Sequence, residues 1–115
     1  MKDDRLGYVL FDKNILDWRW YNDSNTFRLF FHLIINAKYG KKELGNKTLE
    51  PGQVIYGRKQ LANQLGLSEQ NIRTSLNKLK STKEITIKTT SKYSLITITN
   101  WEFYQKEKYK SAIKL

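Results

Sequence analysis

The sequence contains no cysteine among its 115 residues, and this absence excludes disulfide bonds, thiolate metal sites and cysteine nucleophiles. No apolar run approaches the length that a membrane-spanning helix needs. The opening stretch MKDDRLGYVLFDK lacks the apolar centre of a secretion signal. We therefore expect a cytoplasmic protein with no membrane attachment.

Acidic residues are scarce, because 11 Asp and Glu stand against 21 Lys and Arg, a formal net charge of +10. The surplus is unevenly spread: residues 58–92 hold eight basic and two acidic side chains, whereas residues 1–24 hold four and five. A basic surplus of this size in a small domain favours a polyanionic partner, most commonly nucleic acid. The alternative is a lysine-rich protein whose charges serve only its solubility.

The length and the hydrophobic and aromatic contents, 39% and 13%, are those of one small globular domain. The segment GYVLFDKNILDWRWYND is an aromatic extension whose large rings are expected to pack on the domain, namely Trp18, Trp20 and Tyr21. A helix is predicted through TFRLFFHLIINAKYG, capped by Asp23 or Ser24 and ended by Gly40. Its apolar residues lie almost all round, so it is either central to the core or shared with a partner subunit.

The segments after this helix alternate between turn-rich and periodic patterns. GKKELGNKTLEPGQ is predicted to be a loop, because Gly, Asn, Pro and charges gather there, and QVIYG a brief strand. In EITIKTTSKYSLITITN, Ile alternates with Thr or Lys on both sides of the turn TTSK, which predicts a hairpin with one buried face. Two helices precede the hairpin. This order predicts an α+β winged helix-turn-helix: a three-helix core, a short strand and a C-terminal β-hairpin wing.

The helix-turn-helix itself is predicted at RKQLANQLGLSEQNIRTSLNKLKS. Its first helix runs from about Arg58 to Leu65, and Gly66 occupies the turn, where a positive φ costs a residue without Cβ little. Ser68 caps the second helix. That helix then buries one face through residues at i, i+4 and i+7 spacing: Ile72, Leu76 and Leu79.

The opposite face of the second helix carries residue types that major-groove readout uses: Gln70, Arg73, Thr74 and Asn77. Arg can pair with guanine, Gln and Asn with adenine, and Thr can contact the thymine methyl group. The alternative interpretation is an ordinary solvated face. Such a face would usually mix charges of both signs, and no acid lies on this arc.

Further contacts, mainly to the sugar-phosphate backbone, are predicted around this face. On the second helix and its cap they are Ser68, Asn71, Lys78 and Lys80, and at the start of the first helix they are Arg58 and Lys59. In the wing, where the alternative is a plain surface hairpin, they are Lys88, Ser91, Lys92 and Tyr93.

No catalytic or metal site is expected. His32, the single histidine, lies within an apolar helix and fits a core or interface position better than catalysis. The acids Asp12, Asp17 and Asp23 lack the spacing of metal ligands and are expected at turns or helix caps. No glycine-rich loop that could cradle a phosphate precedes a helix. We therefore predict neither an enzyme nor a cofactor.

Three segments together resemble a known family: GYVLFDKNILDWRWYNDSNTFRLFFHLIINAKY, LEPGQVIYGRKQLANQLGLSEQNIRTSLNKLKS and EITIKTTSKYSLITITNWEFYQ. In order and spacing they are similar to the amino-terminal winged-helix domain of phage replisome organisers, the DnaD-like replication proteins of phages, prophages and mobile elements of Gram-positive bacteria. The resemblance covers about residues 7–105. It implies a module in the cytoplasm of the bacterial host that binds duplex origin DNA, forms homo-oligomers and contacts replication proteins such as a helicase loader.

The domain organisation expected from these features is an extension over residues 1–24, the winged helix-turn-helix over residues 25–100 and a tail over residues 101–115 that can lead into a further region. Two other functions stay open. One is a transcriptional regulator of a phage or mobile element. The other is a winged helix used mainly for protein–protein interaction and oligomerisation.

Overall fold

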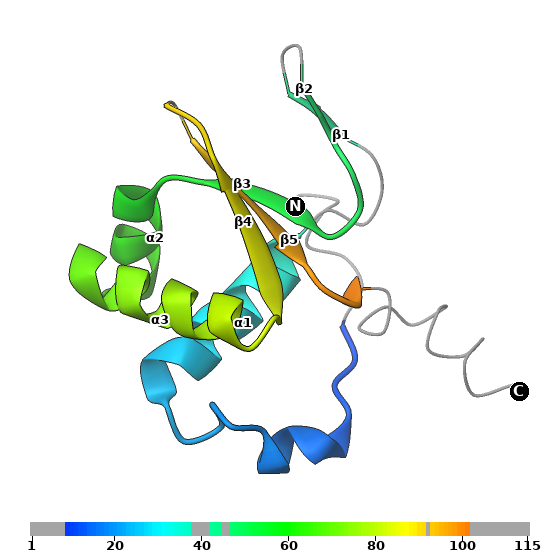
Figure 1. Cartoon of the computed structure of the whole chain (residues 1–115), viewed down its shortest axis with the longest axis vertical. Coiled ribbons are helices and arrows are strands. Elements are labelled where there is room, and N and C mark those ends of the chain that lie inside the picture. Colours follow the sequence, from blue (N-terminus) through cyan, green and yellow to red (C-terminus); the bar gives the residue numbers. More distant parts are fainter. Residues whose placement is uncertain (1–8, 38–41, 45–46, 92, 102–115) are drawn as a thin grey trace, which may run out of the picture.

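The computed structural model describes residues 9–37, 42–44, 47–91 and 93–101, which contain three α-helices and two antiparallel sheets. The chain is therefore of the α+β class (Figure 1). In chain order the elements are the 3₁₀ helix η2 (Lys13–Asp17), α1 (Ser24–Asn36), β1 (Lys42–Leu44), β2 (Lys47–Leu49), β3 (Gln53–Tyr56), α2 (Arg58–Leu65), α3 (Glu69–Ser81), β4 (Ile85–Thr89) and β5 (Ser94–Ile98). This order is compatible with a winged-helix-like fold.

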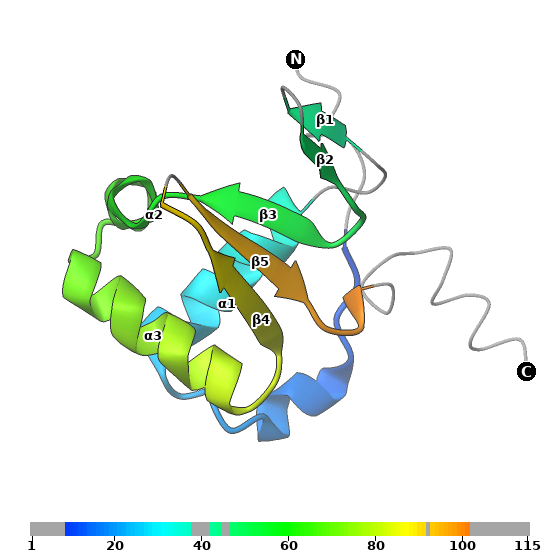
Figure 2. The ribbon, with the colours of Figure 1, turned by 45° about the horizontal axis from the view of Figure 1, so that its top comes forward.

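The larger sheet has the strand order β3-β5-β4 and is antiparallel throughout. Ile87 and Val54 both pair with Ile96 of the central strand β5, one from each side. Ile85, Ile96 and Ile98 are buried, whereas their sequence neighbours are more exposed, so the hairpin predicted from alternation is confirmed. Figure 2 shows α1 behind this sheet, and the buried face of the sheet packs against that helix in one core.

Helix α1 lies at the centre of the core. Leu29, Leu33 and Ile34 are almost completely buried, and Asp23 caps the helix by accepting a hydrogen bond from the Thr26 amide, as expected. Within the chain, the extension covers other apolar residues of the helix: Phe11 stacks on Phe31 at a centroid distance of 4.2 Å, and Trp18 lies 5.0 Å from Phe30 and 6.2 Å from Phe27. The nearly all-round apolar surface of α1 is thus mostly used inside the chain, although Ile35 stays 62% exposed.

The sequence predicts a loop and a helix terminator in the region after α1. The segment predicted to be a loop contains the hairpin β1–β2, in which Lys42 pairs with Leu49 and Leu44 with Lys47, so that prediction was wrong. Helix α1 ends at Asn36, with Ala37 as its C-cap in an extended conformation. Gly40, predicted as the terminator, lies outside the described residues.

None of the helices that the structure describes has the length and apolar character required to cross a membrane.

Candidate nucleic-acid interface

The turn between α2 and α3 has the geometry that its sequence predicts. Gly66 has φ +68°, ψ +32°, and the Leu67 amide donates to the Ala62 carbonyl at 3.0 Å, which closes the end of α2. The Ser68 hydroxyl oxygen then accepts from the Asn71 amide at 3.0 Å and caps α3. The two helices are therefore joined by a tight turn, with a capping hydrogen bond at each of the two facing ends.

Helix α3 separates an apolar face from a polar one. The buried stripe predicted from spacing is confirmed, with Ile72, Leu76 and Leu79 at most 3% exposed. On the other side, Gln70, Arg73, Thr74 and Asn77 are all exposed, and we call these four residues the α3 arc. The Gln70 side-chain amide donates weakly to the Thr74 hydroxyl at 3.4 Å. The arc carries one positive charge, no negative charge and donors and acceptors that face solvent.

Two of the predicted contacts next to the arc, Asn71 and Lys80, are also exposed, as is the capping Ser68. A third, Lys78, is partly buried and already has partners. Its ammonium lies 2.5 Å from a carboxylate oxygen of Asp23 and 5.5 Å from the centroid of the Trp20 ring. Sequence reasoning placed Lys78 at the helix flank but missed both partners, because they lie more than 50 residues away in the chain.

The Asp23 carboxylate in this pair is also an α1 cap. Partial burial acts to raise its pKa, but the hydrogen bonds from Lys78 and from the Thr26 amide outweigh that effect, so the pKa of Asp23 lies below its ordinary value of 3.8. Asp23 is therefore charged at neutral pH, and Lys78 is held beside it. We conclude that Lys78 is less available to a nucleic acid than the exposed Lys80.

The β4–β5 hairpin, which the sequence predicts as a wing, has its turn end near the start of α2. Tyr56, which precedes α2, pairs with Ser94 of β5, so the turn between β4 and β5 lies on the α2 side of the sheet (Figures 1 and 2). Burial raises the pKa of the Tyr56 phenol, although a hydrogen bond with Ser94 and the charge of Arg58 act in the opposite direction. Arg58 therefore lies near the turn end of the β4–β5 hairpin.

The predicted cations at the start of α2, Arg58 and Lys59, are exposed. Of the wing contacts, Lys88 and Ser91 are exposed and Tyr93 is partly buried, with its carbonyl accepting from the Thr90 amide at 2.8 Å. Lys92 lies outside the described residues.

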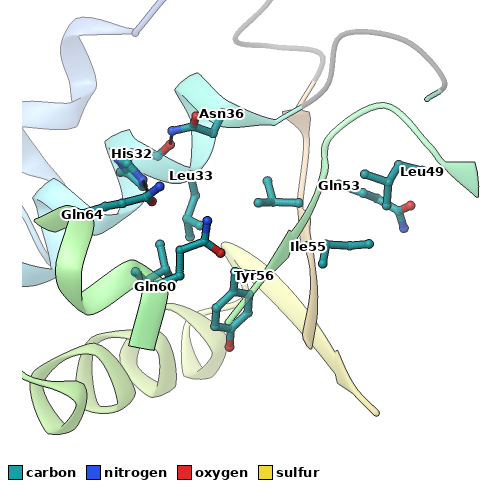
Figure 3. A pocket seen from close by; sticks show the side chains of 11 residues that line it. His32, Leu33, Asn36, Leu49, Gln53, Ile55, Tyr56, Gln60 and Gln64 are labelled. Carbon is teal, nitrogen blue, oxygen red and sulfur yellow. Dashed lines mark hydrogen bonds between the residues drawn. The ribbon is translucent and has the colours of Figure 1, made fainter. Parts of the chain in front are cut away.

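A separate hollow of about 270 Å³ lies between α1, α2 and the edge strand β3 (Figure 3). His32 is at its rim, and its Nε2 lies 3.0 Å from the Gln64 side-chain oxygen, while the Asn36 amide donates to the His32 carbonyl. The hollow is lined mainly by amide and aliphatic side chains, and one of its amides, Gln53, donates to the Thr97 hydroxyl oxygen at 3.1 Å. It does not touch the α3 arc.

No protein-family model, no curated protein and no solved structure matches the chain.

Proposed function

We propose that this chain is a winged helix-turn-helix module that binds duplex DNA through α3. The observation that carries the proposal is the α3 arc: four exposed side chains of the groove-reading types, free of acids, on a helix that a left-handed Gly66 turn sets against α2. An α-helix with such a face fits the width of the major groove. The net charge of +10 supports a polyanionic ligand.

In this proposal the α3 arc contacts base edges, with Arg73 directed to guanine and Gln70 or Asn77 to adenine. The exposed groups around it hold the DNA backbone and set the register of the protein on the duplex. These backbone contacts come from the α3 flanks, the start of α2 and the wing: Ser68, Asn71, Lys80, Arg58, Lys59, Lys88, Ser91 and Tyr93. Lys92, which lies outside the described residues, stays a predicted backbone contact.

We further propose that the module serves replication initiation of a phage or mobile element in a bacterial cytoplasm, with homo-oligomers and a helicase loader as partners. The support is the resemblance of the chain to replisome organisers. A transcriptional regulator of such an element would use the same DNA-binding surface. Binding to repeats of a replication origin, compared with binding to promoter DNA of the same element, distinguishes the two.

The rival in which the fold serves mainly protein interaction was motivated by the apolar character of α1. Most of the apolar surface of that helix packs against the core and the extension. Little of it is left for a partner protein, which argues against a function in protein interaction. The mass of the protein measured by light scattering, with and without duplex DNA, distinguishes the two functions. A protein-interaction function requires an oligomer whose mass does not depend on DNA.

The experiment that tests base readout is the substitution Arg73→Ala, measured on a duplex selected from a random library and on an unselected duplex. We expect a loss of about 1–3 kcal/mol on the selected duplex and a much smaller loss on the unselected one, because a base contact is lost rather than a phosphate contact. Asn63→Ala, an exposed polar change on α2, is the control and should change neither affinity. Equal losses on both duplexes for Arg73→Ala would contradict the assignment.

A further inference from the structure

The aromatic extension is fixed against the carboxyl end of α3 by two indole hydrogen bonds. Trp18 Nε1 donates to the Glu84 carboxylate at 2.9 Å, and Trp20 Nε1 donates to the Thr82 hydroxyl oxygen at 2.9 Å. Thr82 is itself the C-cap of α3, and its hydroxyl donates to the Lys78 carbonyl. The turn that contains Trp20 therefore has a defined position beside the helix that carries the α3 arc.

The indole ring of Trp20 contacts two cations that come from different parts of the chain. The Lys78 ammonium lies 5.5 Å from the ring centroid and the Arg19 guanidinium 6.0 Å, both within the range of cation–π attraction. Asp23 is bound to the lysine at 2.5 Å, so the group as a whole keeps one positive charge. Arg19 is exposed and makes its ring contact without using its N–H donors. We call Arg19, Trp20 and Lys78 the Trp20 cluster.

The Trp20 cluster borders the α3 arc on the side away from the wing. At about 100° per residue, Lys78 lies on one flank of the arc, and Lys80 lies on the other. In Figures 1 and 2 the extension, drawn in blue, lies on one side of α3, whereas α2 and the tip of β4–β5 lie on the other. A duplex seated on the arc with one backbone near the wing would bring its other backbone toward the Trp20 cluster.

We propose that the Trp20 cluster is a second backbone-binding edge of the DNA interface, with Arg19 as its phosphate contact. This inference rests on the proposed function. Arg19 carries five N–H donors and is weakly hydrated, which suits phosphate binding, and the indole restricts its side chain before DNA arrives. Asp23 and Trp20 hold Lys78 in place and are positioning residues. The extension is then part of the DNA-binding surface as well as a cover for α1.

The test is Arg19→Gln, measured by fluorescence anisotropy on a random duplex over a range of salt concentrations. We expect weaker binding and a salt slope lowered by about one, because one neutralised phosphate is lost. The matched control is Lys13→Gln, which removes an exposed cation from the same extension at η2 and should leave the slope unchanged. The urea midpoint of each variant is measured alongside, and we expect both to equal that of the wild type.

Two results would overturn the inference: a slope for Arg19→Gln equal to that of the wild type, or equal losses for Arg19→Gln and Lys13→Gln. The second result would mean that only total charge matters. A failure of the proposed function itself would give another result: the wild type would show no salt-dependent binding to duplex DNA. This inference alone is refuted if the wild type binds duplex DNA and Arg73→Ala weakens that binding, but Arg19→Gln changes neither the affinity nor the salt slope.

Discussion

Asp23 connects two parts of the molecule through its two carboxylate oxygens. One oxygen accepts from the Thr26 amide at 3.2 Å and caps α1, and the other accepts from the Lys78 ammonium on α3 at 2.5 Å. The adjacent Thr26 hydroxyl donates to the Ser75 hydroxyl oxygen in a buried contact at 3.0 Å, which joins the same two helices. A short stretch at the start of α1 thus holds α3 in place.

The lowered pKa of Asp23 makes a prediction about acid. Because the folded-state pKa lies below the unfolded one, the charged carboxylate stabilises the fold above the unfolded pKa, and this contribution is lost as the pH falls through the folded pKa. Asp23→Asn keeps a good N-cap but removes the charge. We expect the urea midpoint of the variant to lie below that of the wild type at neutral pH, with the gap closing below about pH 4.

The control for this prediction is Asp17→Asn, which removes a more exposed carboxylate from the extension. Its urea midpoint should follow the wild type across the same pH range. A gap for Asp23→Asn that stays constant from neutral to acid pH would show that the ion pair with Lys78 does not contribute.

At the scale of the elements, α2 and α3 are both followed by a residue in the left-handed region, but that residue is a glycine after α2 and a lysine after α3. Gly66 closes α2 at φ +68°, and Lys83 follows the C-cap of α3 at the same φ. The Glu84 amide donates to the Leu79 carbonyl and the Lys83 amide to the Lys80 carbonyl, the pattern of a Schellman motif. A lysine in the left-handed region is strained, whereas a glycine is not.

These two helix ends predict stability changes of opposite sign. Lys83→Gly should raise the free energy of unfolding by up to about 1 kcal/mol, because it relieves a left-handed side chain. Gly66→Ala should lower it by about 1–2 kcal/mol, and this cost is one of backbone conformation because an added Cβ meets no atom within 4 Å.

Urea unfolding of the variants measures both changes. Lys83→Ala keeps the Cβ in the left-handed region and is the control, so it should gain nothing. A loss of stability in Lys83→Gly would contradict this account of the α3 terminus.

The elements that the sequence predicts well are those with strong local signals. Helix α2 begins at Arg58 and ends at Leu65, and α3 begins just after its cap at Ser68, because periodicity, a glycine and a capping serine act within a few residues.

The sequence did not predict the hairpin β1–β2. Its strands are three residues each, in a segment rich in Lys, Gly and Asn, and the burial of Leu49 to 2% is a tertiary effect that no local pattern shows.

At the scale of the whole molecule, one part of the proposed interface can be predicted from local sequence, and another part depends on tertiary packing. The α3 arc follows from helix geometry alone, since residues opposite a buried stripe must face outward. The ion pair between Asp23 and Lys78 and the ring of Trp20 beneath two cations depend on how the extension packs. The rings of Trp18 and Trp20 were expected to pack on the domain, but no local pattern in the sequence indicates that the extension lies beside α3.

The central claim is that the α3 arc and the exposed cations proposed to contact the DNA backbone form one surface for duplex DNA. The most direct test is the fluorescence anisotropy of a labelled random duplex titrated with the protein at salt concentrations from about 50 to 200 mM. The account predicts binding whose affinity falls steeply with salt, with a slope that implies about four to six neutralised phosphates. No binding at the lowest salt concentration would contradict it, because the lysines and arginines would then serve solubility alone.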